Sequence, residues 1–472
     1  MTRCDLERVQ EWFASGALVH PLSGPTTVEL VRTLYSRCLR ERDALPANPG
    51  REAEEEQLRR ELALPDDAHV ALFVLDGLGL ELLQTLPESA FLRRHFRRPI
   101  NAVFPSSTAT AITSIATATY PAEHGILGWT LTLLEPPSQA ADVGAAHSAP
   151  TQHTQHFPLR FNPLPFTPDP QQLDSVVPAP ATSLEALGVS ASEIFCTPSA
   201  WPQLDVPTIV NHAYIHGAYS EHHMRAHEKV EGGDIREVLA NLRRFWLAQA
   251  AAAAQHKTHG LQQTASERTS APAAATAAAS LAYCYVNEPD HSCHEYGFDS
   301  KPARRALTVL NAALEEFWAD INADAALGPS SVALVITADH GHRMVTSSQV
   351  QRLDSRLAAC LAALPSTEPR APCLHARPEM SAALESAWTA SALTRKFALL
   401  SIAEAEQLRL FGPQPLSPQA RRFAGDYVAV TDSGDIILNG EQPLYMVGWH
   451  GGLSRSEMLV PLIVATTANP AF

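Results

Sequence analysis

Apolar runs alternate with amphipathic stretches from about residue 69 onward, and this alternation predicts an α/β domain. The apolar runs are rich in β-branched and aromatic residues, as buried strands are. They are HVALFVLDG (69–77), NAVFPSS (101–107), YCYVNEPD (283–290), SVALVITADHG (331–341) and MLVPLIVATT (458–467). Strands that alternate with helices favour a largely parallel central sheet covered by helices on both faces.

Helical periodicity is strongest in PARRALTVLNAALEEFWADI (302–321). Its large apolar residues recur at a spacing that places them on one helix face. They are Leu307, Leu310, Leu314, Phe317 and Ile321. Ser300 is a candidate N-cap. A second helix is expected over 108–119, although its many Thr and Ser residues are poor helix formers and would need packing to hold them.

The parts outside this alternation divide into an N-terminal extension and two insertions. Residues 1–65 predict a mostly helical extension, and 66–472 would form the catalytic domain. The segments near 134–172 and 248–280 are Pro/Gln/His/Ala-rich and Ala/Thr/Gln-rich. Because neither has the pattern of a packed core, both are expected to be flexible loops.

Composition narrows the possible partners. The formal net charge of −15 argues against a nucleic-acid polymer, whose phosphates need a basic surface. It is compatible with an anionic small molecule, because bound divalent cations reverse the local field. The seven cysteines form no C-x-x-C pair, which favours reduced thiols. No signal peptide and no apolar run of about 18 residues is recognised, so a cytoplasmic protein without a membrane span is expected.

Polar residues follow three of the apolar runs. Asp76, Asp290 and Asp339 each lie at the carboxyl end of a predicted strand, the edge at which α/β sheets bind ligands. His294 lies four residues after Asp290, a spacing that would place both on one face of a helical turn and suit a metal. Each pattern alone is equally compatible with an exposed turn or a cap.

Thr108 and His450 are further candidates with structural alternatives. Thr108 would open a helix in FPSSTATA, where its hydroxyl would lie beside free backbone N–H groups that suit an anionic phosphoryl group. By itself, this segment favours a role for Thr108 only as a helix cap. His450 is flanked by glycines in GWHGGLS, which would allow close approach to an ion or simply form a turn.

Taken together and in order, these blocks resemble the type I phosphodiesterase and nucleotide pyrophosphatase group of the alkaline phosphatase superfamily. The similar blocks are VLDGLG (74–79), FPSSTATAITSIATATYPAEHGILGW (104–129), YVNEPDHSCHEYG (285–297), ITADHG (336–341) and WHGGLSRSEMLVPL (449–462). The resemblance implies an alkaline phosphatase-like three-layer sandwich. It also implies a hydrolase of phosphoric ester or phosphoanhydride bonds.

The resemblance also implies a site with two divalent metal ions, zinc or alternatively manganese. One ion would be held by Asp290, His294 and His450. The other would be held by the nucleophile Thr108 together with three further ligands, which are Asp76, Asp339 and His340. A bound dication would lower the pKa of the threonine hydroxyl, which is otherwise a poor nucleophile. The expected substrate is a small phosphoester or a nucleotide.

Some features leave the substrate open. Diesterases of the family often carry an Asn three residues after the nucleophile, where this chain has Ala111. A phosphomonoesterase or phosphonate hydrolase of the same superfamily is therefore an alternative. A catalytically inactive phosphate-binding protein would predict loss of a ligand or of Thr108, and neither is lost. A sulfatase would need a C-x-P-x-R pattern, and the segment that starts at Cys196 lacks its Arg.

Overall fold

The computed structural model describes residues 4–39, 45–135, 157–169, 183–213, 215–262, 279–327, 331–441 and 443–467. Its centre is a seven-stranded sheet with the order β2-β18-β9-β1-β8-β6-β7. The strands are β1 (His69–Leu75), β2 (Phe96–Asn101), β6 (Thr208–Asn211), β7 (Glu228–Val230), β8 (Ser280–Val286), β9 (Val332–Thr337) and β18 (Leu459–Thr466). β18 pairs antiparallel with both β9 and β2, while the pairs from β9 through β7 are parallel.

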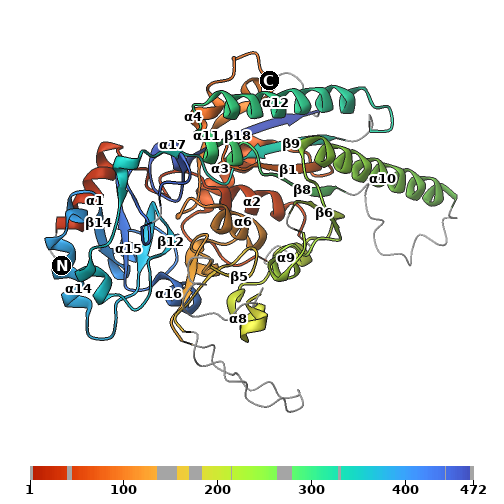
Figure 1. Cartoon of the computed structure of the whole chain (residues 1–472). Helices are drawn as coiled ribbons and strands as arrows, with labels where there is room; N and C mark the ends of the chain where they lie inside the picture. The colour runs from red at the N-terminus through yellow and green to blue at the C-terminus, as the bar shows by residue number, and fades with distance from the viewer. Residues whose placement is uncertain are drawn as a thin grey trace, which may run out of the picture.

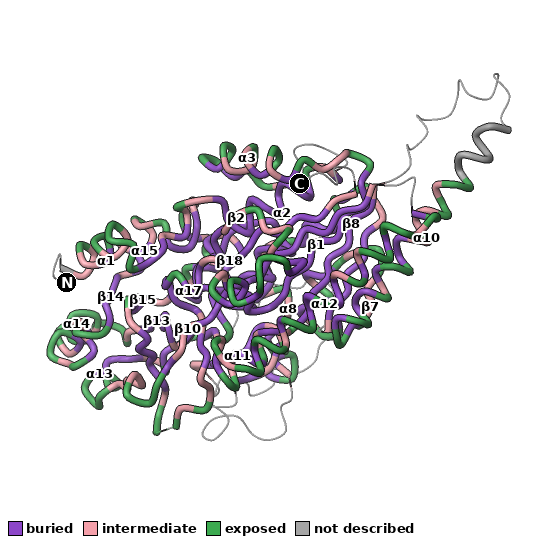
Figure 2. The backbone as a smooth tube through the Cα atoms, turned by 90° about the horizontal axis from the view of Figure 1, so that it is seen from above, coloured by how far each residue is buried: buried purple, intermediate pink, exposed green. Residues whose placement is uncertain are grey.

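Helices cover both faces of this sheet, as the alternation predicts (Figure 1). One face carries α4 (Leu80–Leu83), α5 (Phe91–Arg94), α10 (Ile235–Gln262) and α12 (Lys301–Ala323). The other face carries α2 (Thr27–Ser36), α6 (Thr108–Thr117) and α9 (Ala218–His223). The central strands are buried along most of their length (Figure 2). The predicted α/β fold with a mostly parallel sheet between helices is confirmed.

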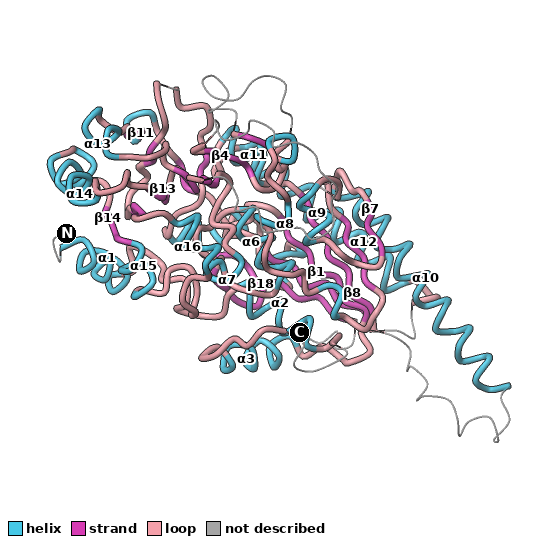
Figure 3. Tube along the Cα trace, turned by 90° about the horizontal axis from the view of Figure 1, so that it is seen from below, coloured by secondary structure: helices cyan, strands magenta, loops and turns pink. Residues whose placement is uncertain are grey.

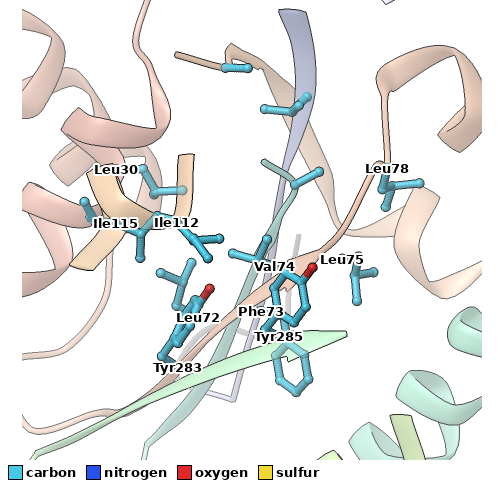
Figure 4. Close-up of a cluster of buried hydrophobic side chains, with 14 of the residues drawn as sticks. Leu30, Leu72, Phe73, Val74, Leu75, Leu78, Ile112, Ile115, Tyr283 and Tyr285 are labelled. Carbon is cyan, nitrogen blue, oxygen red and sulfur yellow. The ribbon is translucent and has the colours of Figure 1, made fainter. Parts of the chain in front are cut away.

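The core forms where the apolar faces meet the sheet. In Figure 4, Leu30 of α2 and Ile112 of α6 gather on the same side of β1 as Leu72. The face of α12 predicted from its periodicity is buried, and each such side chain contributes about 1.5–3 kcal/mol relative to exposure. Ser300 caps this helix by accepting the Ala303 N–H.

A second, smaller sheet lies at the opposite end of the molecule from α10 (Figures 1 and 3). It is antiparallel, with the order β12-β13-β15-β14. Its strands are β12 (Ser366–Glu368), β13 (Ala371–Leu374), β14 (Ala398–Ser401) and β15 (Tyr427–Val430). The helices in this part of the chain are α13 (Ser355–Cys360), α14 (Ser381–Ala390), α15 (Ile402–Gln407) and α16 (Pro418–Ala424). The sequence patterns considered above did not predict this sheet.

Short elements complete the described chain. The remaining helices are α1 (Cys4–Ser15), α3 (Glu52–Leu62), α7 (Pro121–His124), α8 (Ala191–Ile194), α11 (Asp290–Tyr296) and α17 (Arg455–Met458). The 3₁₀ turns are η3 (Glu185–Leu187), η4 (Trp201–Gln203), η5 (Ser347–Gln349) and η6 (Ala392–Arg395). The small strand pairs are β10 (Arg343–Met344) with β17 (Gly448–Trp449), and β11 (Val350–Gln351) with β16 (Ile436–Ile437). None of the described helices combines the length and apolar character needed to cross a bilayer.

The structure departs from three local expectations. The strand expected over 101–107 lies earlier, as β2, which ends at Asn101. Within 134–172, β4 (Leu159–Asn162) and β5 (Thr167–Pro168) form a buried sheet with β3 (Leu131–Leu133) instead of a flexible loop.

Within 248–280, α10 continues to Gln262, in keeping with the helix preference of alanine. Residues 136–156, 170–172 and 263–278 of the two insertions lie outside the described residues.

His223, on α9, makes the stability of the fold sensitive to acid. Its side chain is buried beside Phe195 and Tyr219, and neither ring nitrogen has a hydrogen-bond partner among the described residues. Burial lowers its pKa to about 3. The unfolded chain therefore binds a proton near pH 6.5 that the fold excludes, so stability falls as the pH drops from 6.5 toward 3.

We expect His223→Phe to reduce this acid sensitivity. Between pH 7 and pH 5, the free energy of unfolding should fall by about 2 kcal/mol less in His223→Phe than in the wild type. Urea unfolding at both pH values measures this difference. The exposed His216 provides the control, since His216→Gln should leave the pH dependence unchanged. Equal pH dependence in the His223 variant and the wild type would contradict the prediction.

Candidate metal and phosphoryl site

Thr108 is the first residue of α6, at the edge of the sheet where the strands end. The helix is buried along its whole length, and the Thr113 and Thr117 hydroxyls donate to carbonyls one turn earlier. Packing therefore holds a sequence of poor helix formers in a helix, as predicted, and these bonds satisfy the buried hydroxyls. The Thr108 Oγ1 lies 3.1 Å from the Nε2 of His340, and Thr108 lines a cleft of about 830 Å³.

Asp76, Asp339 and His340 form the first cluster of potential ligands. Asp76 follows β1 and Asp339 follows β9, two neighbouring parallel strands. One ligand atom from each of the three residues lies within 4.8 Å of the others. The structure therefore brings together the residues that the sequence assigned to one ion, directly beside Thr108.

Asp290, His294 and His450 form the second cluster, again with ligand atoms within 4.8 Å of one another. Asp290 opens α11 and His294 lies one turn later, so the spacing of four places both on one face. The Nε2 atoms of His294 and His450 are 3.2 Å apart. The rings of His340 and His450 stack at 3.7 Å, so the two clusters are adjacent.

The three histidines share a hydrogen-bonding pattern that suits metal ligation. In each ring, Nδ1 contacts a backbone carbonyl: that of Gly448 for His294, Gly341 for His340 and Ser106 for His450. Because a carbonyl can only accept, Nδ1 must carry the proton, and Nε2 presents its lone pair. Three Nε2 lone pairs thus face the same region as the carboxylates.

The carboxylates also keep one oxygen available. Asp339 Oδ1 accepts the backbone N–H groups of Gly77 and His340, at 3.0 Å each, and Asp76 Oδ2 accepts the Tyr285 hydroxyl. Asp339 Oδ2 and Asp76 Oδ1 are buried and have no hydrogen-bond partner among the described residues. Leaving buried carboxylate oxygens without partners is costly, and cations bound at these atoms would remove the cost. The donor set of carboxylate and imidazole fits zinc or manganese.

The pKa values reflect the crowding of these charges. Burial, together with Asp290 and Asp339, raises the pKa of Asp76 well above its usual value. Burial also acts to raise the pKa of Asp290, but His294 and His342 outweigh it and hold that pKa below the usual range. Burial and the neighbouring His340 lower the pKa of His450. The fold therefore keeps His450 neutral, the form that binds metals.

His342 follows the ITADHG block and lies close to the second cluster. Its Nε2 is 2.8 Å from Asp290 Oδ1, and its ligand atom also groups with those of Asp290 and His340. Gly77 faces it in a left-handed conformation, with φ of +71°. A Cβ at Gly77 would lie 2.7 Å from His342 Nε2 and 2.8 Å from the Asp290 backbone, so a larger residue would displace both. His124 lies elsewhere, bonded to Ser114.

The cleft continues beyond these clusters. Residues in and beside β3 to β5, such as Trp129 and Arg160, line it together with residues of β12 and 437–449, such as Glu368 and Trp449. These two groups adjoin, since Thr130 pairs with Thr367. Trp129 and Trp449 belong to two of the five blocks, and both line the cleft. Sequence reasoning missed Glu368, which belongs to none of the five blocks and reaches the cleft only through the second sheet.

Ala111 does not line the cleft. It is fully buried and packs with Val28, Val103 and Tyr120. Thr110, two residues after Thr108, is also fully buried and is not among the residues that line the cleft. Ala111 therefore contributes to the packing beneath α2, and it is not among the residues that line the cleft.

Comparisons with known proteins agree with this geometry. Residues 70–453 match the family model described as "Type I phosphodiesterase / nucleotide pyrophosphatase". No match is found among curated protein sequences.

Similar solved structures include three of ectonucleotide pyrophosphatase / phosphodiesterase 5. The murine protein has 15% identity and a TM-score of 0.53. An inactive murine variant in complex with AMP has 14% identity and a TM-score of 0.52. The human protein has 14% identity and a TM-score of 0.54. Each comparison covers 84% of this chain and 87% of the other. The predicted alkaline phosphatase-like sandwich is thereby confirmed. The chain belongs to the type I phosphodiesterase / nucleotide pyrophosphatase family of the alkaline phosphatase superfamily, metal-dependent hydrolases of phosphoester bonds.

Proposed function

We propose that this phosphodiesterase / nucleotide pyrophosphatase uses Thr108 as its nucleophile and binds two divalent ions, zinc or alternatively manganese. The convergence of two adjacent ligand clusters beside Thr108 carries the proposal. Asp290, His294 and His450 would hold one ion. Thr108 would share the other with Asp76, Asp339 and His340. When bound, the ions would lower the pKa of the Thr108 hydroxyl and stabilise charge on the phosphoryl group.

The start of α6 supports binding of the phosphoryl group. Ser107 occupies the N-cap position, but its side chain makes no cap hydrogen bond, because the hydroxyl donates to Glu368. The first N–H groups of the helix have no partner within the helix itself and point beyond its end. They can therefore donate to phosphoryl oxygens, and the helix dipole favours the negative charge there. Thr108 would attack phosphorus from this position.

The expected substrate is a small phosphodiester or a nucleotide. A structural neighbour of this chain has been solved with AMP. Trp129 is 42% exposed and offers an aromatic surface on which a base could stack. No nucleic-acid polymer is expected as substrate. The cleft volume of about 830 Å³ is sufficient for a small phosphodiester or a nucleotide.

The direct test measures hydrolysis of bis(p-nitrophenyl) phosphate and p-nitrophenyl phosphate. Purified protein is first stripped with a chelator and then supplied with zinc or manganese, and bound metal is counted by mass spectrometry. We expect two ions per chain and metal-dependent diester hydrolysis that chelation abolishes. Two bound ions without hydrolysis of either ester would favour the inactive binding protein. Hydrolysis that survives complete metal removal would contradict the proposal.

Tyr285 offers a test of the metal site that does not depend on activity. Its hydroxyl donates to Asp76 Oδ2 and so directs Oδ1 toward the proposed ion. Tyr283 lies two residues earlier on β8, is equally buried, and its hydroxyl has no hydrogen-bond partner among the described residues. We expect Tyr285→Phe to weaken metal binding by about 10- to 100-fold. Tyr283→Phe should leave it unchanged.

Titration calorimetry with zinc on the chelated protein compares the two variants. The removed atom is the same in both, so a general effect of losing a buried hydroxyl would appear in each. Equal affinities in both variants and the wild type would show that Tyr285 does not position a metal ligand.

We also propose that residues 1–65 brace the catalytic domain of 66–472. Glu29 on α2 is fully buried. It accepts hydrogen bonds from the Tyr120 hydroxyl and from Arg51 at 3.0 Å. Arg51 and Tyr120 lie respectively just before α3 and just before α7. This buried network ties the extension to the segment that follows the nucleophile helix.

A further inference from the structure

Glu368 places an acidic group next to the nucleophile. Its Oε1 accepts the Ser107 hydroxyl and, at 2.7 Å, the Trp129 N–H. Its side chain also adjoins Gly451, where a Cβ would lie 2.5 Å from the Glu368 Cβ. Ser107 precedes Thr108 and Gly451 follows His450. Glu368 is therefore fixed between the neighbours of the proposed nucleophile and of a proposed metal ligand, and it lines the same cleft as both.

The cleft supplies no cation to balance this carboxyl group. Among the described residues that line the cleft, Arg160 is the only Arg and there is no Lys. Arg160 is buried and forms an ion pair with Asp169 at 3.1 Å. No described Lys or Arg forms an ion pair with Glu368. Outside the proposed metal ligands, the walls of the cleft therefore contribute an uncompensated negative charge near the phosphoryl position.

We propose that Glu368 makes the site selective for phosphodiesters by repelling the second negative charge of a phosphomonoester. The inference rests on the proposed function and concerns its substrate class. A diester carries one negative charge on its phosphoryl oxygens, whereas a monoester carries two in alkaline solution. Asp169 does not act in the same way, because Arg160 neutralises it.

The size of the effect follows from the charge separation. Burial raises the pKa of Glu368 to about 7, so the group is ionised at pH 8.5. At an effective dielectric constant of about 20, a unit charge at a separation on the order of 5–10 Å changes a binding constant by roughly 15- to 300-fold. Because solvent enters the cleft, we expect about 10-fold or more in selectivity.

The experiment compares methyl p-nitrophenyl phosphate with p-nitrophenyl phosphate, which have the same leaving group and differ by one charge. The ratio of kcat/KM for diester over monoester is measured at pH 8.5 in metal-loaded protein. Glu368→Gln keeps the shape and the acceptor oxygen but removes the charge, and Glu368→Asp keeps the charge but shortens the side chain. We expect the ratio to fall about 10-fold or more in Glu368→Gln, through a gain in monoester hydrolysis, and to fall less in Glu368→Asp.

Glu315 provides a control for the general effect of removing a carboxylate. It lies on α12 and is half-exposed in a pair with Arg94, so Glu315→Gln should leave the ratio unchanged. An unchanged ratio in a folded Glu368→Gln protein would overturn the inference. An equal fall of the ratio in Glu368→Asp would also overturn the inference, because the shape of the side chain and not its charge would then determine the selectivity. Failure of the wild type to hydrolyse either ester would instead overturn the proposed function.

A binding measurement covers the case in which Glu368→Gln does not fold. In the wild type, dimethyl phosphate carries one charge and methyl phosphate carries two at pH 8.5. We expect dimethyl phosphate to inhibit diester hydrolysis at least as strongly as methyl phosphate. Inhibition by methyl phosphate that is 10-fold stronger or more would contradict repulsion by Glu368.

Discussion

Thr108→Ala should lower kcat for bis(p-nitrophenyl) phosphate by about 10³-fold or more while the protein still binds metal. The variant loses the oxygen that would attack phosphorus and keeps the six other proposed ligands, which come from separate parts of the chain. Among the described residues, the hydroxyl makes one hydrogen bond, with His340 at 3.1 Å, so stability should change little. Steady-state kinetics, metal counting and a thermal melt on the same preparation measure the three quantities.

Two variants separate loss of the nucleophile from damage to α6. Thr108→Ser retains an attacking oxygen and should recover most of the activity. Thr110→Val replaces a hydroxyl that has no hydrogen-bond partner among the described residues and is fully buried on the same helix, so activity should persist. If Thr108→Ala retained wild-type kcat, Thr108 would not be the nucleophile.

The arrangement of a central sheet between two layers of helices could be predicted from the sequence, because it depends on the local patterns of apolar residues in strands and helices. The buried strands β1 and β9 are continuous apolar runs, and the face of α12 repeats at helical spacing. The edge strand β2 was misplaced because FRRPIN is half-exposed and charged, which conceals its strand character. The sheet β12-β13-β15-β14 was missed because its strands are only three or four residues long, too short to show a period.

The candidate site was predictable to the extent that its residues lie in contiguous blocks. Asp290 and His294 share one helical turn, so sequence spacing alone places that pair. Asp76 and Asp339 each follow an apolar strand, and the carboxyl ends of parallel strands lie at one edge of the sheet. Glu368 could not be found this way, since it reaches Ser107 from 261 positions away in the chain. The same holds for Tyr285 and Asp76, whose bond depends on the register of β1 beside β8.

The buried ion pair of Arg370 and Glu457 should be the strongest single support of the cleft wall. Both side chains are fully buried, and Arg370 donates to both carboxylate oxygens, at 2.9 and 2.8 Å. Arg370 also donates to the carbonyls of Ser433 and Asp435. Glu457 accepts the N–H of Gly452, two residues after His450. The pair therefore joins the second sheet to the segment that carries a proposed metal ligand.

Arg370→Met should lower the free energy of unfolding by about 3–5 kcal/mol, because it leaves the Glu457 carboxylate buried without a cation. Arg94→Met is the matched control: the Arg94–Glu315 pair is half-exposed, and its loss should cost about 0–1 kcal/mol. In the double variant Arg370→Met/Glu457→Gln, no buried charge remains, so part of the stability should return. Urea unfolding of the wild type, the two single variants and the double variant measures these differences in the free energy of unfolding. If Arg370→Met cost no more than Arg94→Met, burial would not be what makes this pair important, and the second sheet would have to be held against the cleft by apolar packing alone.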